Sequence, residues 1–87
     1  MEFVWIFKGN GANPFPSAVF SNLEKAEAWI KKHKLTGTLT KYPIDISVFD
    51  WAIKKEYFSP NEHHFQPKVI GNFSSASQEH FHYEDGV

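Results

Sequence analysis

The stretch QEHFHYEDG, residues 78 to 86, combines the residue types that bind metal ions or transfer protons. His80 and His82 are separated by one residue, and Glu84 continues the same alternation. In a strand, alternate side chains point to one face, so the imidazoles would stand roughly 7 Å apart at Cβ, close enough to bind one ion. The pattern therefore allows a metal-dependent hydrolase, with zinc as its cofactor.

A plain surface strand explains the same pattern. Phe81 and Tyr83 alternate with the histidines, and polar side chains belong on an exposed strand face. Further ligands would have to come from His63 or His64, which lie in a polar stretch that reads as an exposed loop. A catalytic zinc also needs an oriented second shell that sequence cannot show. We favour the surface strand without a cofactor, and keep the zinc site as the alternative.

Other catalytic patterns are weaker, and no catalytic residue is predicted. The GNGA stretch lacks the helix that should follow a phosphate-binding loop, because Pro14 and Pro16 intervene. It is expected to be a plain hairpin connection, with glycines at positive φ. The serines of SSAS could be combined with His80 and Asp85, but no G-x-S-x-G nucleophile elbow exists.

Composition narrows the function classes further. A chain of 87 residues with 41% hydrophobic and 17% aromatic residues suits one small domain, residues 1–87, with an aromatic core. The formal net charge is −1, and all nine cationic residues are lysine, which argues against nucleic-acid binding. The longest apolar run, FVWIF, is far short of the ~20 residues of a membrane-spanning helix. Without cysteine, a reducing cytoplasm is the expected location.

Four strands are predicted from alternation and turn residues. EFVWIFK carries Phe3, Trp5 and Phe7 on one face and Val4 and Ile6 on the other, so it should be a central strand. The other strands are SAVF, which forms a hairpin with the first, then LTGTLTKY, and the beginning of EHFHYEDG. In LTGTLTKY, Gly37 is expected to supply a helix stop or a turn.

Three helical segments are predicted between the strands. The first runs from Asn22 to about Lys34, with Ser21 and Glu24 as a capping box. Its apolar arc consists of Leu23, Ala26, Trp29, Ile30 and His33, and the His33 ring is expected to be partly buried and bonded to a terminal carbonyl. The second, SVFDWAIKKEYF, begins at a Ser47 cap, and the third is a short turn that starts at Pro67.

These elements predict an α+β fold. The order is ββαβααβ, with a small, mostly antiparallel sheet packed by one long amphipathic helix and two shorter helical segments. The predicted core residues are Trp5, Phe7, Phe20, Leu23, Ile30, Leu39, Trp51 and Ile53.

The first strand also suggests a function, because both of its faces are apolar. Either the second helix and PKVIGNF cover the free face within the chain, or a partner does. We favour cover within the chain, and take Phe3, Trp5 and Phe7 as the candidate partner or dimer surface. The most consistent function is non-catalytic binding of another protein, as in inhibitors or immunity-type partners, with a homodimer as a second expectation.

Three stretches together carry a resemblance over nearly the whole chain: VWIF-x-GNGA, SAVFSNLEKAEAWIKKHKLTGTLTKYP and EHFHYEDG. They are similar to a family of small bacterial proteins classed as a domain of unknown function. The resemblance implies a single α+β domain of bacterial origin. It implies no activity, ligand or site residue.

Overall fold

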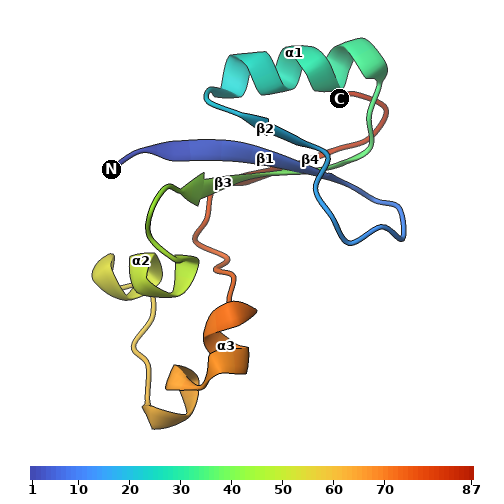
Figure 1. Ribbon diagram of the computed structural model, residues 1–87. Coiled ribbons are helices and arrows are strands. Elements are labelled where there is room, and N and C mark those ends of the chain that lie inside the picture. The colour runs from blue at the N-terminus through green and yellow to red at the C-terminus, as the bar shows by residue number, and fades with distance from the viewer.

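Four strands form one antiparallel sheet in the computed structural model, which describes residues 1–87 (Figure 1). The order across the sheet is β2-β1-β3-β4, so β1 is central as predicted. The chain order ββαβααβ and the α+β class are also confirmed. The strands are β1 (Phe3–Gly9), β2 (Ala18–Phe20), β3 (Gly37–Pro43) and β4 (His80–Tyr83).

Helix α1 (Leu23–His33) covers one face of this sheet. Alternation in β1 turns Trp5 and Phe7 toward the helix, where they are 7% and 2% exposed. The fully buried side chains beside them are Ala26, Ile30 and Leu39. Of the other predicted core residues, Phe20 and Leu23 are half-buried against this cluster, Trp51 is buried outside it, and Ile53 is only half-buried.

The two ends of α1 differ from the prediction. The N-cap is Asn22, whose side chain accepts a hydrogen bond from the Lys25 backbone N–H at 2.8 Å, so the predicted Ser21 capping box is wrong. The C-cap is Lys34, with φ 51°, and Gly37 neither stops the helix nor forms a turn. His33 is exposed, with its ring edge-on to another aromatic ring of the helix instead of bonded to a terminal carbonyl.

The glycines of the GNGA loop also differ from the prediction. Neither Gly9 nor Gly11 has a positive φ, whereas Gly86, in the turn after β4, has φ 87°. The loop therefore uses no left-handed glycine, and the other left-handed positions of this chain are occupied by charged residues such as Asp45 and Glu56.

Helices α2 (Val48–Lys54) and α3 (Pro67–Gly71) form a second aromatic cluster with the short 3₁₀ helix η1 (Glu62–Phe65). The Ser47 hydroxyl caps α2 by accepting from the Asp50 backbone N–H at 3.0 Å, as predicted. The α2 helix is shorter than the sequence suggested, and the predicted loop contains η1. Phe49 is 2% exposed and packs against Phe58, Phe65 and Phe73.

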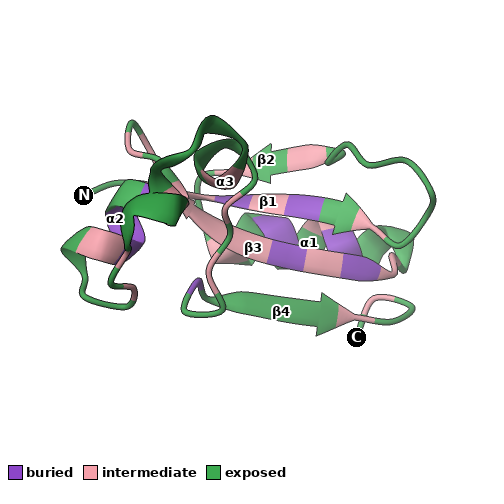
Figure 2. Cartoon of the chain, turned by 90° about the horizontal axis from the view of Figure 1, so that it is seen from below, coloured by how far each residue is buried: buried purple, intermediate pink, exposed green.

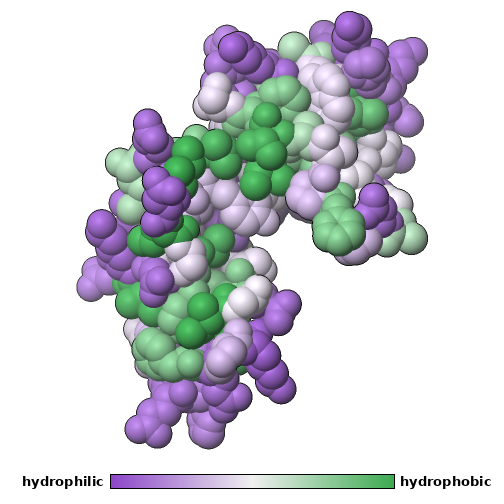
Figure 3. All heavy atoms as spheres, in the orientation of Figure 1, coloured by the Kyte–Doolittle hydropathy of each residue, from purple (hydrophilic) through white to green (hydrophobic).

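The molecule is elongated. Its radius of gyration is 14.3 Å, compared with about 12 Å for an average compact chain of this length. Figure 3 shows the cause: the lobe of the sheet and α1 is separated by a hollow from the lobe of α2, η1 and α3. The second lobe meets the sheet through contacts between α2 and β3, whereas α3 packs on η1.

Candidate functional site

The sheet face opposite α1 is a candidate contact surface, because α1 leaves it free. Trp5, Phe7 and Leu39 pack on α1, so their neighbours along each strand point to the other side. The strand register places these neighbours directly opposite one another, for example Ile6 between Val19 and Thr40. We call this surface the open face; it consists of Val4, Ile6, Lys8, Val19, Thr38, Thr40, Tyr42, His80 and His82.

The open face has an apolar part and a polar part. Val4, Ile6, Val19 and Tyr42 lie together over β2, β1 and the end of β3. Val19 is 63% exposed, and the other three are half-buried. Figure 2, which views the molecule from below, shows buried and intermediate residues alternating along β1 and β3, as expected when one face of the sheet is packed. The threonines and histidines of β3 and β4 form the polar part.

The predicted partner surface is on the wrong face. Trp5 and Phe7 are buried beneath α1, and Phe3 is half-buried with the Lys41 ammonium 4.5 Å from its ring centroid. None of the three belongs to the open face. The apolar residues available for contact are instead Val4 and Ile6, on the other side of the same strand.

The predicted intrachain cover by the second helix and PKVIGNF is present only in part. The PKVIGNF stretch packs mainly on η1, and its Ile70 is 37% exposed. The main contact between the second lobe and the sheet is made by α2 with β3. The stretch of the open face over β1 and β2 is therefore left to solvent or to a partner.

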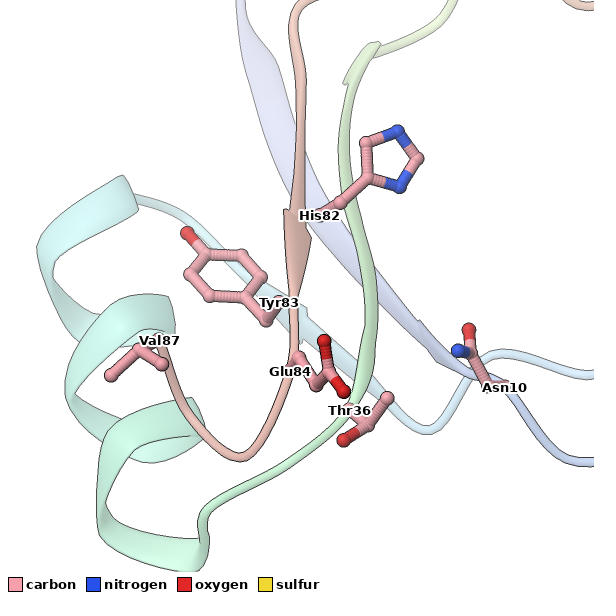
Figure 4. A pocket seen from close by; sticks show the side chains of 6 residues that line it. All are labelled: Asn10, Thr36, His82, Tyr83, Glu84 and Val87. Carbon is pink, nitrogen blue, oxygen red and sulfur yellow. The ribbon is translucent and has the colours of Figure 1, made fainter.

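His80 and His82 lie side by side on the open face, as the alternation predicted. Their ring centroids are 5.4 Å apart at an interplanar angle of 90°. His80 Nδ1 donates to the Gln78 carbonyl at 2.7 Å, and His82 Nδ1 lies 3.3 Å from the Thr38 hydroxyl. Figure 4 shows His82 and Glu84 on the same side of β4, and Tyr83 on the opposite side.

The remaining members of the candidate zinc set are placed elsewhere. His63 and His64 lie on η1 in the second lobe. His64 Nδ1 accepts from the Asn61 backbone N–H at 2.9 Å, and its ring packs 4.9 Å from the Phe58 ring. No group of three or more His, Cys, Asp or Glu side chains is arranged to hold a metal ion. The five residues of the set are not brought together.

A surface hollow of about 510 Å³ lies at the end of β4, next to the open face (Figure 4). Its shape depends on the turn after Glu84, where Glu84 and Val87 exchange backbone hydrogen bonds, and on Thr36, whose hydroxyl accepts from the Asp85 N–H at 3.0 Å. The lining residues are Asn10, Thr36, His82, Tyr83, Glu84 and Val87. Sequence reasoning missed Asn10, Thr36 and Val87, because only the tertiary fold brings their three segments together.

One comparison with known proteins found a match. A family model described as "Domain of unknown function (DUF7710)" matches residues 4–87. The chain belongs to this family. The resemblance noted in the sequence is thereby confirmed as far as membership of a family of unknown function. No curated protein and no solved structure matches the chain.

The helices of this DUF7710 protein are all too short or too polar to cross a membrane. Because the family description assigns no ligand, function has to be argued from the geometry of the open face itself.

We expect Tyr83 to make the stability of this protein depend on pH. Its hydroxyl donates to Glu27 Oε2 on α1 at 2.9 Å, which ties β4 to the helix. Burial raises the pKa of Tyr83 from 10.0 to about 12, and the hydrogen bond to Glu27 and its negative charge act in the same direction. A raised folded-state pKa means that this contribution to stability is complete below pH 10 and is lost as the pH rises toward 12.

We therefore expect the free energy of unfolding to fall across this interval, and Tyr83→Phe to reduce the fall. The tyrosinate absorbance should contain a step near pH 12 that is absent in Tyr83→Phe. Glu27→Gln should move the step to lower pH, because it removes the negative charge beside the phenolate. A step that is unchanged in Glu27→Gln would show that Glu27 has no influence on this hydroxyl.

Proposed function

We propose that this DUF7710 protein is a non-catalytic module that binds another protein through the open face. The observation that carries the proposal is the contiguous apolar area of Val4, Ile6, Val19 and Tyr42, in which Val19 is 63% exposed and the other three are half-buried. An uncovered apolar area with a polar margin is the usual composition of a protein contact surface.

The polar part of the face suits the same role. Thr38, Thr40, His80 and His82 offer hydroxyls and ring nitrogens beside the apolar area. A partner could therefore bury the apolar side chains and satisfy hydrogen bonds at the margin. An inhibitor or immunity-type role, acting in a reducing cytoplasm that suits a chain without cysteine, is the form of this proposal that we favour.

The metal-dependent hydrolase is supported less well. A catalytic zinc takes three protein ligands and keeps a fourth position open for water or substrate. The open face supplies the imidazoles of His80 and His82, and no arrangement of three ligating side chains contains them. The histidine pair is explained as part of the polar margin.

The test is affinity capture from the native host with three forms of the protein. Val19→Lys places a charge in the apolar area at a residue that is 63% exposed, so the fold should tolerate it. Ala28→Lys is the matched control, because Ala28 is exposed on α1, away from the open face. We expect a protein partner that wild type and Ala28→Lys retain, and whose affinity falls at least about tenfold, or 1.4 kcal/mol, in Val19→Lys.

Light scattering of the same three forms separates a foreign partner from a second copy. A dimer that Val19→Lys dissociates and Ala28→Lys leaves intact would identify the partner as this chain itself. A partner bound equally by all three forms would contradict the open face as the contact surface. Recovery of a small metabolite without any protein would contradict the binding-module function.

A further inference from the structure

A second, smaller pocket lies where the sheet meets the second lobe, away from the hollow at the end of β4. Its volume is about 180 Å³, below the roughly 300–1,000 Å³ of pockets that hold drug-sized ligands. It therefore has room for a small organic molecule only. Its lining residues come from β1, β3, α2, the segment after α2 and the segment before β4; they are Phe3, Lys41, Trp51, Tyr57, Ser77, Gln78 and Glu79.

Buried Gln78 holds two sides of this pocket in place. The side chain is 3% exposed, and both ends of its amide are used. Its Nε2 donates to the Lys41 carbonyl at 3.1 Å, and its Oε1 accepts from the Ser75 N–H at 2.9 Å. The pocket wall that carries Lys41 and Ser77 is thereby preorganised, as binding sites require.

Trp51 contributes a hydrogen-bond donor without an acceptor. Its side chain is 7% exposed, and the indole Nε1 makes no hydrogen bond in the chain. Buried indole N–H groups in proteins normally have an acceptor, and this group can only donate. The ring of Tyr57 lines the same pocket, packs edge-on at 5.5 Å from that of Trp51 and is 56% exposed; we infer that its movement gives a ligand access to the indole N–H. The Trp51 N–H therefore has no acceptor within the chain, and a bound ligand would supply one.

The positive charge of Lys41 favours a negatively charged ligand. Aromatic walls can also hold an external cation, but the Lys41 ammonium already lies 4.5 Å from the Phe3 ring centroid and 5.9 Å from that of Trp5. A second cation would be repelled. The one carboxylate beside it, Glu79, lies 3.6 Å away with its side chain 55% exposed. Such a solvent-exposed pair contributes little, so a ligand can displace Glu79 into water.

We propose that this pocket binds a small organic carboxylate, whose oxygens accept hydrogen bonds from Lys41 Nζ and Trp51 Nε1. The carbon skeleton of the ligand packs against Phe3 and Tyr57. The Ser77 hydroxyl is a further donor at the same wall. This site is independent of the open face and of the function proposed for it.

The test follows the three indole N–H signals of the ¹⁵N-labelled protein by NMR while benzoate is added. Trp51→Phe identifies the Trp51 signal. We expect benzoate to shift that signal saturably and downfield, as a new charge-assisted hydrogen bond requires. Benzamide, which has the same ring but no charge, should produce a much weaker effect. A Trp51 signal that does not move, or that moves equally with benzamide, overturns the proposal.

Three variants make the result specific to the pocket. Lys41→Met keeps the aliphatic stem and should weaken benzoate at least about tenfold, whereas Lys41→Arg should retain it. Glu79→Gln should strengthen benzoate, because it removes the competing carboxylate. Lys68→Met is the matched control: Lys68 is exposed on α3 and does not line the pocket. The same affinity in Lys41→Met and Lys68→Met would show that benzoate binds elsewhere, against the proposal.

Discussion

Gly37→Ala is expected to destabilise the protein by about 3 kcal/mol or more, the range of severe overpacking. A Cβ at this position would overlap the carbonyl oxygen of Lys8 and lie 2.7 Å from Cζ of Phe7 and 2.9 Å from Cα of Gly9. Two of these atoms belong to the backbone of β1, the central strand, so they cannot move without disturbing its pairing with β3.

The measurement is urea unfolding, with Gly11→Ala as the matched control. No atom lies within 4 Å of a Cβ added at Gly11, and its φ is not in the left-handed region. Gly11→Ala should therefore change the free energy of unfolding by no more than about 0.5 to 1 kcal/mol, and in the stabilising direction. Equal effects of the two substitutions would show that β1 and β3 do not approach as closely at Gly37 as the structure describes.

Gly37 also bears on the function proposed for the sheet. It pairs with Gly9 at one end of the β1–β3 register, and that register places Ile6 opposite Thr40 on the open face. A slip by one residue would turn the open-face side chains of one strand to the opposite face. A close contact that only glycine tolerates makes such a slip costly. Sequence analysis missed this role, because the contact partner, β1, is distant in the chain.

Strand β1 shows where alternation stops being informative. Its pattern predicted a central strand with Trp5 and Phe7 on one face and Val4 and Ile6 on the other, and both statements are confirmed. The same pattern could not say which face α1 would cover. That choice depends on the crossover from β2 through α1 to β3, and its handedness rule applies only once the strand order is known.

The other predictions failed where the end of a helix depends on a local cap, or where a side chain is positioned by residues distant in the sequence. Ser21 and Asn22 are both good N-cap residues, and local propensity does not distinguish between them. Glu56 has φ 61°, so the apolar residues after it leave the α2 axis, although their spacing continued the helical pattern. The histidine pair of β4 is local and was predicted, whereas His64 is positioned by its own cap and by the second aromatic cluster.

Phe49→Ala should cost about 3–5 kcal/mol, the usual range for a buried phenylalanine. Phe49 is 2% exposed, and its ring centroid lies 5.7 Å from that of Phe58, 5.5 Å from that of Phe65 and 5.4 Å from that of Phe73. These rings join η1 and the segments after α2 and α3, so Phe49 is the side chain that holds the second lobe together. The matched control is Phe65→Ala, which deletes a ring of the same cluster that is 57% exposed and should cost markedly less.

The loss should be confined mainly to the second lobe, because Phe49 is outside the cluster in which Trp5, Phe7, Ile30 and Leu39 pack under α1. Hydrogen exchange of Phe49→Ala should show amides of α2 and α3 losing protection while those of β1 and β3 keep theirs. Equal loss in both lobes would show that the molecule unfolds as one cooperative unit. The same variant separates the two proposed sites. Trp51 is carried by α2, so benzoate binding should be lost, whereas the open face, formed by the strands alone, should still capture its partner.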